Sequence, residues 1–157
     1  QKESLIGESA GDMSASALAC GGDVDGDGTL DMLVASPGYE HSMGRTYLVL
    51  GSTFSGDFDL VDADVIVDGE NRGDLSGSEV SFAGDVDGDG LSDVLVGSWA
   101  NDDGGILAGK VYLLPGASLA DNKIENLADQ TNLVARQPYG ARPNRGRTMA
   151  FGFSVSL

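Results

Sequence analysis

The sequence predicts an all-β fold, a segment of a β-propeller built from four-stranded antiparallel blades. Three observations predict it: a long internal repeat, short β-rich apolar segments bounded by turn residues, and segments that are apolar on both faces. Glycine supplies 24 of the 157 residues and proline only 4, which favours many tight turns over long helices. The length is that of about one domain.

The internal repeat organises the chain. Residues 22–36 read GDVDGDGTLDMLVAS and residues 84–98 read GDVDGDGLSDVLVGS, which are identical at 11 of 15 positions with an offset of 62. Residues 151–157 resemble residues 76–82, so a third copy begins near the end of the sequence. We expect residues 1–7 to be the last strand of a preceding blade, 8–68 a first blade, 69–136 a second blade, and 137–157 a basic loop and the first strand of a third blade.

Each repeat contains four apolar segments that are typical of strands. The expected strands are 16–22, 31–36, 45–51 and 63–68 in the first blade, and 78–84, 93–98, 109–115 and 131–136 in the second. Residues 47–50 and 111–114 are apolar on both alternating faces, so both faces need cover. Stacked sheets that close into a propeller provide it, whereas the alternative, a β-sandwich, leaves one wet face per strand.

Two acidic loops, residues 23–31 and 85–93, carry the strongest chemical signal. Each has Asp at positions 1, 3, 5 and 9, glycine at position 6, and a position 7 that can offer its backbone carbonyl, a pattern that suits a hard cation. An EF-hand has Glu at position 12, where these loops have Val34 and Val96. The expected ligands of two Ca²⁺ ions are Asp23, Asp25, Asp27, Thr29, Asp31, Asp85, Asp87, Asp89, Leu91 and Asp93.

The charge of these loops also indicates a metal. Four carboxylates within nine residues repel one another, and a divalent cation turns that repulsion into attraction. Mg²⁺ is less suited because it demands strict octahedral geometry and holds its water. Without Glu at position 12 we expect a dissociation constant on the order of 10⁻⁴ to 10⁻³ M. The alternative is an acidic, solvated turn, which does not explain two copies in the same register.

These motifs resemble the FG-GAP repeats of the integrin α-subunit propeller and of its bacterial relatives, which bind calcium. Phe151-Gly152 followed by Ser154-Val155 is similar to the FG half, Ala35-Ser36-Pro37-Gly38 is similar to the GAP half, and the acidic loops match the calcium loops between them. The resemblance covers nearly the whole chain. It implies a propeller like that at the N-terminus of integrin α-subunits, an extracellular or cell-surface location, and a role in adhesion or protein recognition.

The loop end opposite the calcium loops is the expected contact surface. From Gln130 onward the chain has four arginines and no carboxylate, a charge of +4 against −20 for the preceding 129 residues. The candidate partner-binding residues are Tyr39, Trp99, Tyr139, Arg142, Arg145 and Arg147. The alternative is a solvated loop that neutralises nearby acidic turns.

Other function classes find less support. The net charge of −16 disfavours nucleic acid, and no apolar run approaches the ~20 residues of a membrane helix. The single histidine, His41, falls in a loop, and the single cysteine, Cys20, is expected to be a small core residue, so we expect no catalytic activity.

We therefore expect a calcium-binding propeller segment that recognises a protein partner or associates with further blades. Two alternatives stay open: an assembly subunit that associates through its end strands, and an accessory module of a secreted hydrolase. The tripeptide Arg72-Gly73-Asp74, which some integrins recognise, also occurs here, but Gly-Asp recurs at Gly11-Asp12 and a turn explains it.

Overall fold

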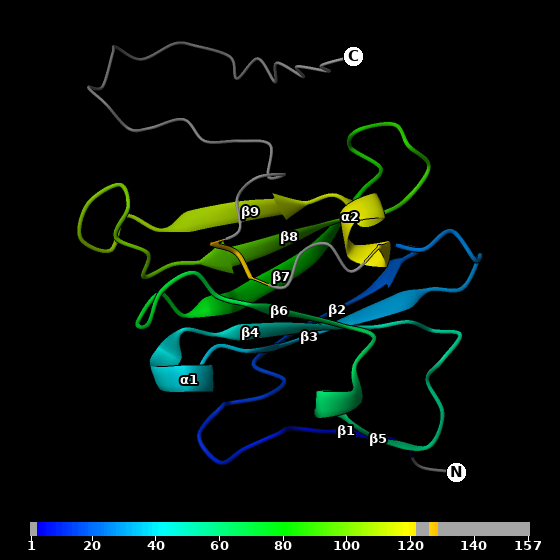
Figure 1. Cartoon of the computed structure of the whole chain (residues 1–157), viewed down its shortest axis with the longest axis horizontal. Coiled ribbons are helices and arrows are strands. Elements are labelled where there is room, and N and C mark those ends of the chain that lie inside the picture. Colours follow the sequence, from blue (N-terminus) through cyan, green and yellow to red (C-terminus); the bar gives the residue numbers. More distant parts are fainter. Residues whose placement is uncertain (1–2, 122–125, 129–157) are drawn as a thin grey trace.

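The computed structural model describes residues 3–121 and 126–128, which form two stacked antiparallel sheets and a small parallel pair of strands (Figure 1). This arrangement confirms the all-β class. The two sheets lie face to face as neighbouring blades do, and β7 of the second sheet packs across β2 and β3 of the first. The sheets of the described residues do not close into a ring.

The first sheet has the four antiparallel strands expected from the sequence, in the order β2-β3-β4-β6. The strands are β2 (Ala17–Gly22), β3 (Asp31–Ser36), β4 (Arg45–Val49) and β6 (Val65–Asp68). A short turn, α1 (Tyr39–Ser42), lies between β3 and β4.

The second sheet has the order β7-β8-β9. Its strands are β7 (Ser76–Gly84), β8 (Asp93–Ser98) and β9 (Lys110–Leu114), followed by α2 (Gly116–Ala120). The fourth strand expected at residues 131–136 and the third blade expected at 151–157 lie outside the described residues.

The main core lies between the two sheets. Leucine and valine side chains of the first sheet meet Val94, Val96, Tyr112 and Leu114 of the second, and these residues of both sheets are at most 5% exposed. Leu119 of α2 joins the same core. Each of the facing strands therefore buries one side against the neighbouring sheet, and this apolar burial stabilises the stack.

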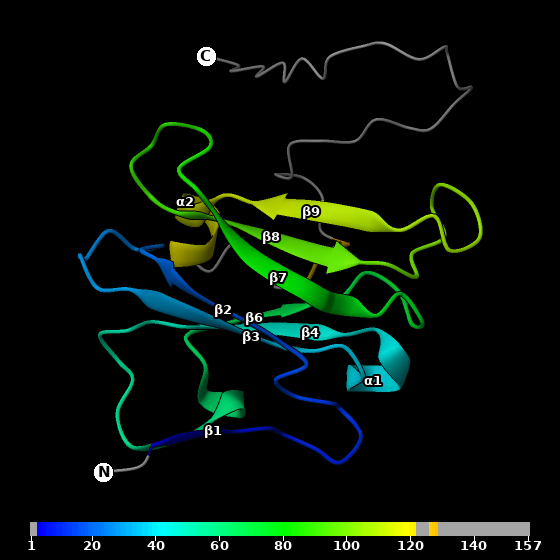
Figure 2. The same ribbon diagram turned by 180° about the vertical axis from the view of Figure 1, so that it is seen from behind.

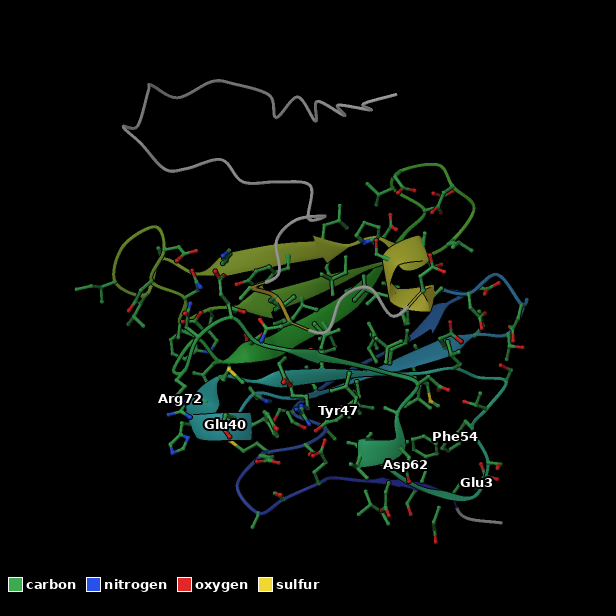
Figure 3. The ribbon with its side chains drawn as sticks, viewed as in Figure 1. Glu3, Glu40, Tyr47, Phe54, Asp62 and Arg72 are labelled. Carbon is green, nitrogen blue, oxygen red and sulfur yellow. The ribbon has the colours of Figure 1, made fainter. Side chains whose placement is uncertain are left out.

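The opposite face of the first sheet is also covered. Val34, Tyr47 and Val49, each at most 1% exposed, pack against Leu60 of the 3₁₀-turn η1 (Leu60–Asp62). In Figure 3, Tyr47 lies between the sheet and the layer formed by η1 and the N-terminal strand. The expectation that residues 47–50 are covered on both faces is confirmed for Tyr47, Leu48 and Val49. In the second sheet, Val111 of β9 is 68% exposed, which differs from that expectation because no described residue covers it.

The covering layer contains a parallel pair of strands, β1 (Ser4–Ile6) and β5 (Asp57–Asp59). A similar parallel pairing links the second blade to the first sheet. Asn126 forms a parallel bridge with Asp68 at the end of β6, and the Leu127 amide donates a hydrogen bond to the Asp68 carbonyl at 2.9 Å. A segment of each blade thus pairs with the strand that precedes that blade.

The loop connections divide between the two ends of the sheets, as expected. The two acidic loops project from one end, while α1 and the β8–β9 connection lie at the other (Figures 1 and 2). At the α1 end, Glu40, His41 and Ser42 all have left-handed backbone conformations, with φ between 45° and 62°. Arg72 contacts Glu40 there, at 2.5 Å from nitrogen to oxygen (Figure 3).

The expectation that Cys20 is a core residue is wrong. Cys20 is exposed because it lies on the face of β2 that points away from the second sheet, where the described residues leave it uncovered, whereas its neighbour Ala19 packs against the core on the other face. The aligned residue of the second blade, Phe82, packs against the core. The two positions therefore differ in environment although they correspond in the repeat.

Candidate metal centres

The first acidic loop connects β2 to β3 and folds around its first carboxylate. The Asp23 carboxylate accepts hydrogen bonds from the amides of Gly26 at 2.7 Å and Gly28 at 3.0 Å. Both glycines have left-handed backbone conformations, with φ of 77° and 87°, which glycine adopts without steric cost. The sharp turn expected at position 6 of the loop is therefore present.

The next two carboxylates are held in the same way. Asp25 accepts a hydrogen bond from the Asp27 amide at 3.1 Å, and Asp27 accepts one from the Thr29 amide at 2.6 Å. Asp23, Asp25 and Asp27 each offer an oxygen, and these oxygens lie within 4.8 Å of one another. The loop thus brings together the carboxylates of positions 1, 3 and 5.

The second acidic loop, between β7 and β8, repeats this construction. The Asp85 carboxylate accepts hydrogen bonds from the amides of Gly88 at 2.6 Å and Gly90 at 3.0 Å, and Asp89 accepts one from Leu91 at 2.8 Å. The oxygens of Asp85, Asp87 and Asp89 also lie within 4.8 Å of one another.

The carboxylates at position 9 lie outside both groups. Asp31 and Asp93 are 0% and 1% exposed, and each accepts two backbone hydrogen bonds. One bond comes from the loop itself and the other from the segment after the third strand, at Gly51 and Gly116. These residues fix the loop to its blade, and their role as ligands stays a prediction, as does that of the carbonyls of Thr29 and Leu91.

The electrostatics differ between the two loops. Hydrogen bonds from the Thr29 amide and from Ser52 lower the pKa of Asp27. Burial raises the pKa of Asp87, and the charges of Asp89, Asp93 and Asp85 act in the same direction. Burial likewise raises the pKa of Asp31, against the effect of its two backbone hydrogen bonds.

The donor set fits a hard divalent cation. Carboxylate oxygens converge in each loop, and backbone amides orient them, so little side-chain entropy remains to be lost on binding. Ca²⁺ takes six to eight oxygen ligands in a flexible geometry, and carbonyls and water can complete a set of three carboxylates.

Two of the candidate partner-binding residues, Tyr39 and Trp99, lie at the other end of the sheets. Trp99 follows β8 and is 57% exposed. The Tyr39 ring is half-buried and stacks with the Arg45 guanidinium, whose carbon lies 3.7 Å from the ring centroid. The four other candidates, Tyr139, Arg142, Arg145 and Arg147, lie outside the described residues.

In the Arg72-Gly73-Asp74 tripeptide, the aspartate is buried and hydrogen-bonded within the fold. Asp74 is 6% exposed, and its carboxylate accepts hydrogen bonds from the side-chain amides of Asn101 at 2.7 Å and Asn71 at 3.2 Å. Arg72 is exposed. A receptor that needs both charged groups cannot reach the Asp74 carboxylate, so the turn interpretation of this motif is favoured.

Sequence reasoning missed two serines beside the acidic loops. Ser52 contacts Asp27, and Ser92 bonds to the backbone of Asp23 in the other blade. The repeat alignment places Ser92 opposite Leu30. The presence of a hydroxyl in one copy and not in the other was the signal in the sequence that could have pointed to this residue.

Among residues 3–121 and 126–128, no helix has the length and apolar character needed to cross a membrane.

Residues 15–49, which include β2, the first acidic loop and β3, match the family model of the FG-GAP repeat. This match confirms the resemblance for that part of the chain. No curated protein sequence matches the chain.

Proposed function

We propose that this chain is a calcium-binding, extracellular β-propeller segment that mediates adhesion or protein–protein recognition. The observation that carries the proposal is the pair of acidic loops, which hold three carboxylates each in the same register in neighbouring blades. The FG-GAP match over residues 15–49 supports a β-propeller-type recognition module. The partner is a protein or further blades of the same kind.

The calcium ions have a structural role in this proposal. Asp23, Asp25 and Asp27 would hold one ion, and Asp85, Asp87 and Asp89 the other. A bound ion supplies positive charge that cancels the repulsion between carboxylates. Two ions change the formal charge of the chain from −16 to −12. The loops then become rigid at one end of the sheets and leave the other end for recognition.

We propose the β8–β9 connection as the recognition surface. Trp99, Ile106 and Leu107 are 57%, 90% and 59% exposed, an unusual concentration of large apolar side chains on a connection of this length. Exposed apolar side chains gathered in one place are typical of protein contact sites, and tryptophan is enriched among the residues that dominate binding energy. We place recognition rather than catalysis at this end.

Isothermal titration calorimetry with CaCl₂ tests the metal proposal. We expect two ions per chain, and one ion in the variant Asp25→Asn/Asp27→Asn, which keeps the second loop intact. Absence of heat at millimolar calcium in the unsubstituted chain contradicts the proposal.

Attachment of cultured cells to the immobilised chain tests the recognition surface. We expect Trp99→Ala to reduce attachment and Val61→Ala to leave it unchanged. Val61 is also 57% exposed but lies in η1, away from the β8–β9 connection, which makes it the matched control. Equal attachment of both variants and the unsubstituted chain contradicts this placement.

A further inference from the structure

We propose that Ser92 of the second acidic loop positions the first ligand of the first loop, so that the two calcium sites bind with positive cooperativity. This inference rests on the proposed calcium binding. Two hydrogen bonds join Ser92 to Asp23 across the blades. The Ser92 amide donates to the Asp23 carbonyl at 2.8 Å, and the Asp23 amide donates to the Ser92 hydroxyl at 3.1 Å.

A second contact supports the same link. Leu91 packs against the turn of the first loop, with its Cδ2 only 3.0 Å from the position that a Cβ on Gly26 would occupy. Gly26 donates to the Asp23 carboxylate, so both contacts act on the part of the first loop that holds its position-1 ligand. The second loop therefore touches the first at its backbone and at its turn.

The backbone around Ser92 can transmit the state of the second loop. Leu91 precedes Ser92 and is the residue whose carbonyl is the expected position-7 ligand, and its amide bonds to Asp89 at 2.8 Å. Asp93 follows Ser92 and is fixed by hydrogen bonds from Val86 and Gly116. An ion in the second loop restricts Leu91, and with it the orientation of the Ser92 amide and hydroxyl.

The link has a direction within this pair of blades. In the first loop the residue corresponding to Ser92 is Leu30, which is 63% exposed and has no hydroxyl. The second loop thus supports Asp23, and coupling between binding sites is reciprocal in free energy. Repulsion between two bound ions opposes this coupling. Salt at physiological concentration screens that repulsion at exposed sites.

Calcium titrations followed by nuclear magnetic resonance on the full chain test the proposal. The Gly28 and Gly90 amides each donate to the position-1 carboxylate of their own loop, so they report the two sites separately. The substitutions Asp87→Asn/Asp89→Asn remove two carboxylates of the second loop. We expect them to weaken calcium binding at the first loop, as reported by the Gly28 amide, about fivefold, the factor that one hydrogen bond contributes.

Ser92→Ala removes the hydroxyl bond and keeps the backbone bond, so it is expected to weaken calcium binding at the first loop, and to reduce the further effect of the Asp87→Asn/Asp89→Asn substitutions. Ser92→Thr keeps a hydroxyl and is expected to restore the coupling. Ser81→Ala is the matched control, because Ser81 is an exposed serine of β7 whose hydroxyl donates a local hydrogen bond to the Phe82 carbonyl.

The outcomes separate the two proposals. If Gly28 and Gly90 both respond to calcium, but the affinity at Gly28 is the same in all variants, the coupling is overturned and calcium binding stands. If neither glycine responds at millimolar calcium, calcium binding is overturned and the coupling with it.

Discussion

The hydroxyl of Tyr47, in the middle of β4, donates a 2.9 Å hydrogen bond to the carboxylate of Glu8, which lies in the segment before β2. The same carboxylate oxygen accepts a bond from Arg45 at 2.9 Å. The second blade repeats the relationship, because the Tyr112 hydroxyl donates to Glu70 at 2.7 Å. In each sheet, a tyrosine of the third strand (β4 or β9) therefore donates a hydrogen bond to an acidic residue that lies outside the sheet.

This relationship predicts a loss of stability at alkaline pH. Burial, and then the hydrogen bond to Glu8, raise the pKa of Tyr47 above its ordinary value of 10.0. The folded state keeps a proton that the unfolded chain releases from about pH 10, so this stabilisation is complete below pH 10 and is lost as the pH rises through the folded-state pKa. Urea unfolding at pH 8 and pH 11 measures the loss.

We expect Tyr47→Phe to lower the free energy of unfolding by about 1.5 kcal/mol at pH 8. The same variant is expected to lose less stability than the unsubstituted chain between pH 8 and pH 11, since it has one fewer titrating group. A loss as steep as that of the unsubstituted chain contradicts the account.

Calcium is expected to raise the melting temperature. With a dissociation constant of about 1 mM, about 10 mM calcium contributes about 1.4 kcal/mol per site. Two sites then raise the melting temperature by about 5 to 10 °C for a chain of this size. Differential scanning calorimetry with and without a chelator measures the shift. Magnesium at the same concentration is the control, and an equal shift with magnesium contradicts a preference for calcium.

Gly44 is expected to be intolerant of a side chain. Its φ is +88°, and a Cβ added there would lie 2.0 Å from the Ser76 carbonyl oxygen of the neighbouring blade. Gly44→Ala therefore combines backbone strain with a backbone clash, and we expect a loss of about 3 kcal/mol or more.

Gly56→Ala is the matched control for Gly44→Ala. Its φ is +72°, but an added Cβ would meet nothing within 4 Å. We expect it to cost about 1 to 2 kcal/mol, the strain of the left-handed conformation alone. Urea unfolding compares the two, and equal losses would show that the contact between blades at Gly44 contributes nothing.

Substitution of Asp74 is expected to destabilise the chain far more than substitution of Arg72, although both belong to one tripeptide. Asp74→Ala leaves the buried Asn101 amide without its partner, and we expect a loss of about 2 kcal/mol. Arg72→Ala removes an exposed ion pair with Glu40 and is expected to change stability by less than about 0.5 kcal/mol. Cell attachment to immobilised Arg72→Ala is expected to equal that of the unsubstituted chain, and a marked drop contradicts the turn interpretation.

The sequence predicted those elements whose pattern is local. Residues 31–36 and 93–98 are strands with the expected bounds, because apolar residues there follow directly on an acidic loop and end at serine. The acidic loops could be predicted for the same reason, since Asp and Gly at fixed spacing determine both the turn and the oxygen donors.

Other features depend on contacts that are distant in sequence. β5 has the sequence Asp57-Phe58-Asp59, which has no apolar run, and it forms a strand because β1 lies beside it. The exposure of Cys20 depends on which face of β2 meets the second sheet, and Cys20 lies on the other face. The contact between Ser92 and Asp23 spans 69 residues and arises only when the blades stack.

Crystals grown with calcium test the central claim most directly. The account predicts one calcium ion in each acidic loop, bound by Asp23, Asp25 and Asp27 in one blade and by Asp85, Asp87 and Asp89 in the next, at oxygen distances of about 2.3 to 2.6 Å. Anomalous scattering identifies the ion. Density for water alone in both loops, from crystals grown in about 10 mM calcium, well above the expected dissociation constant, would contradict it.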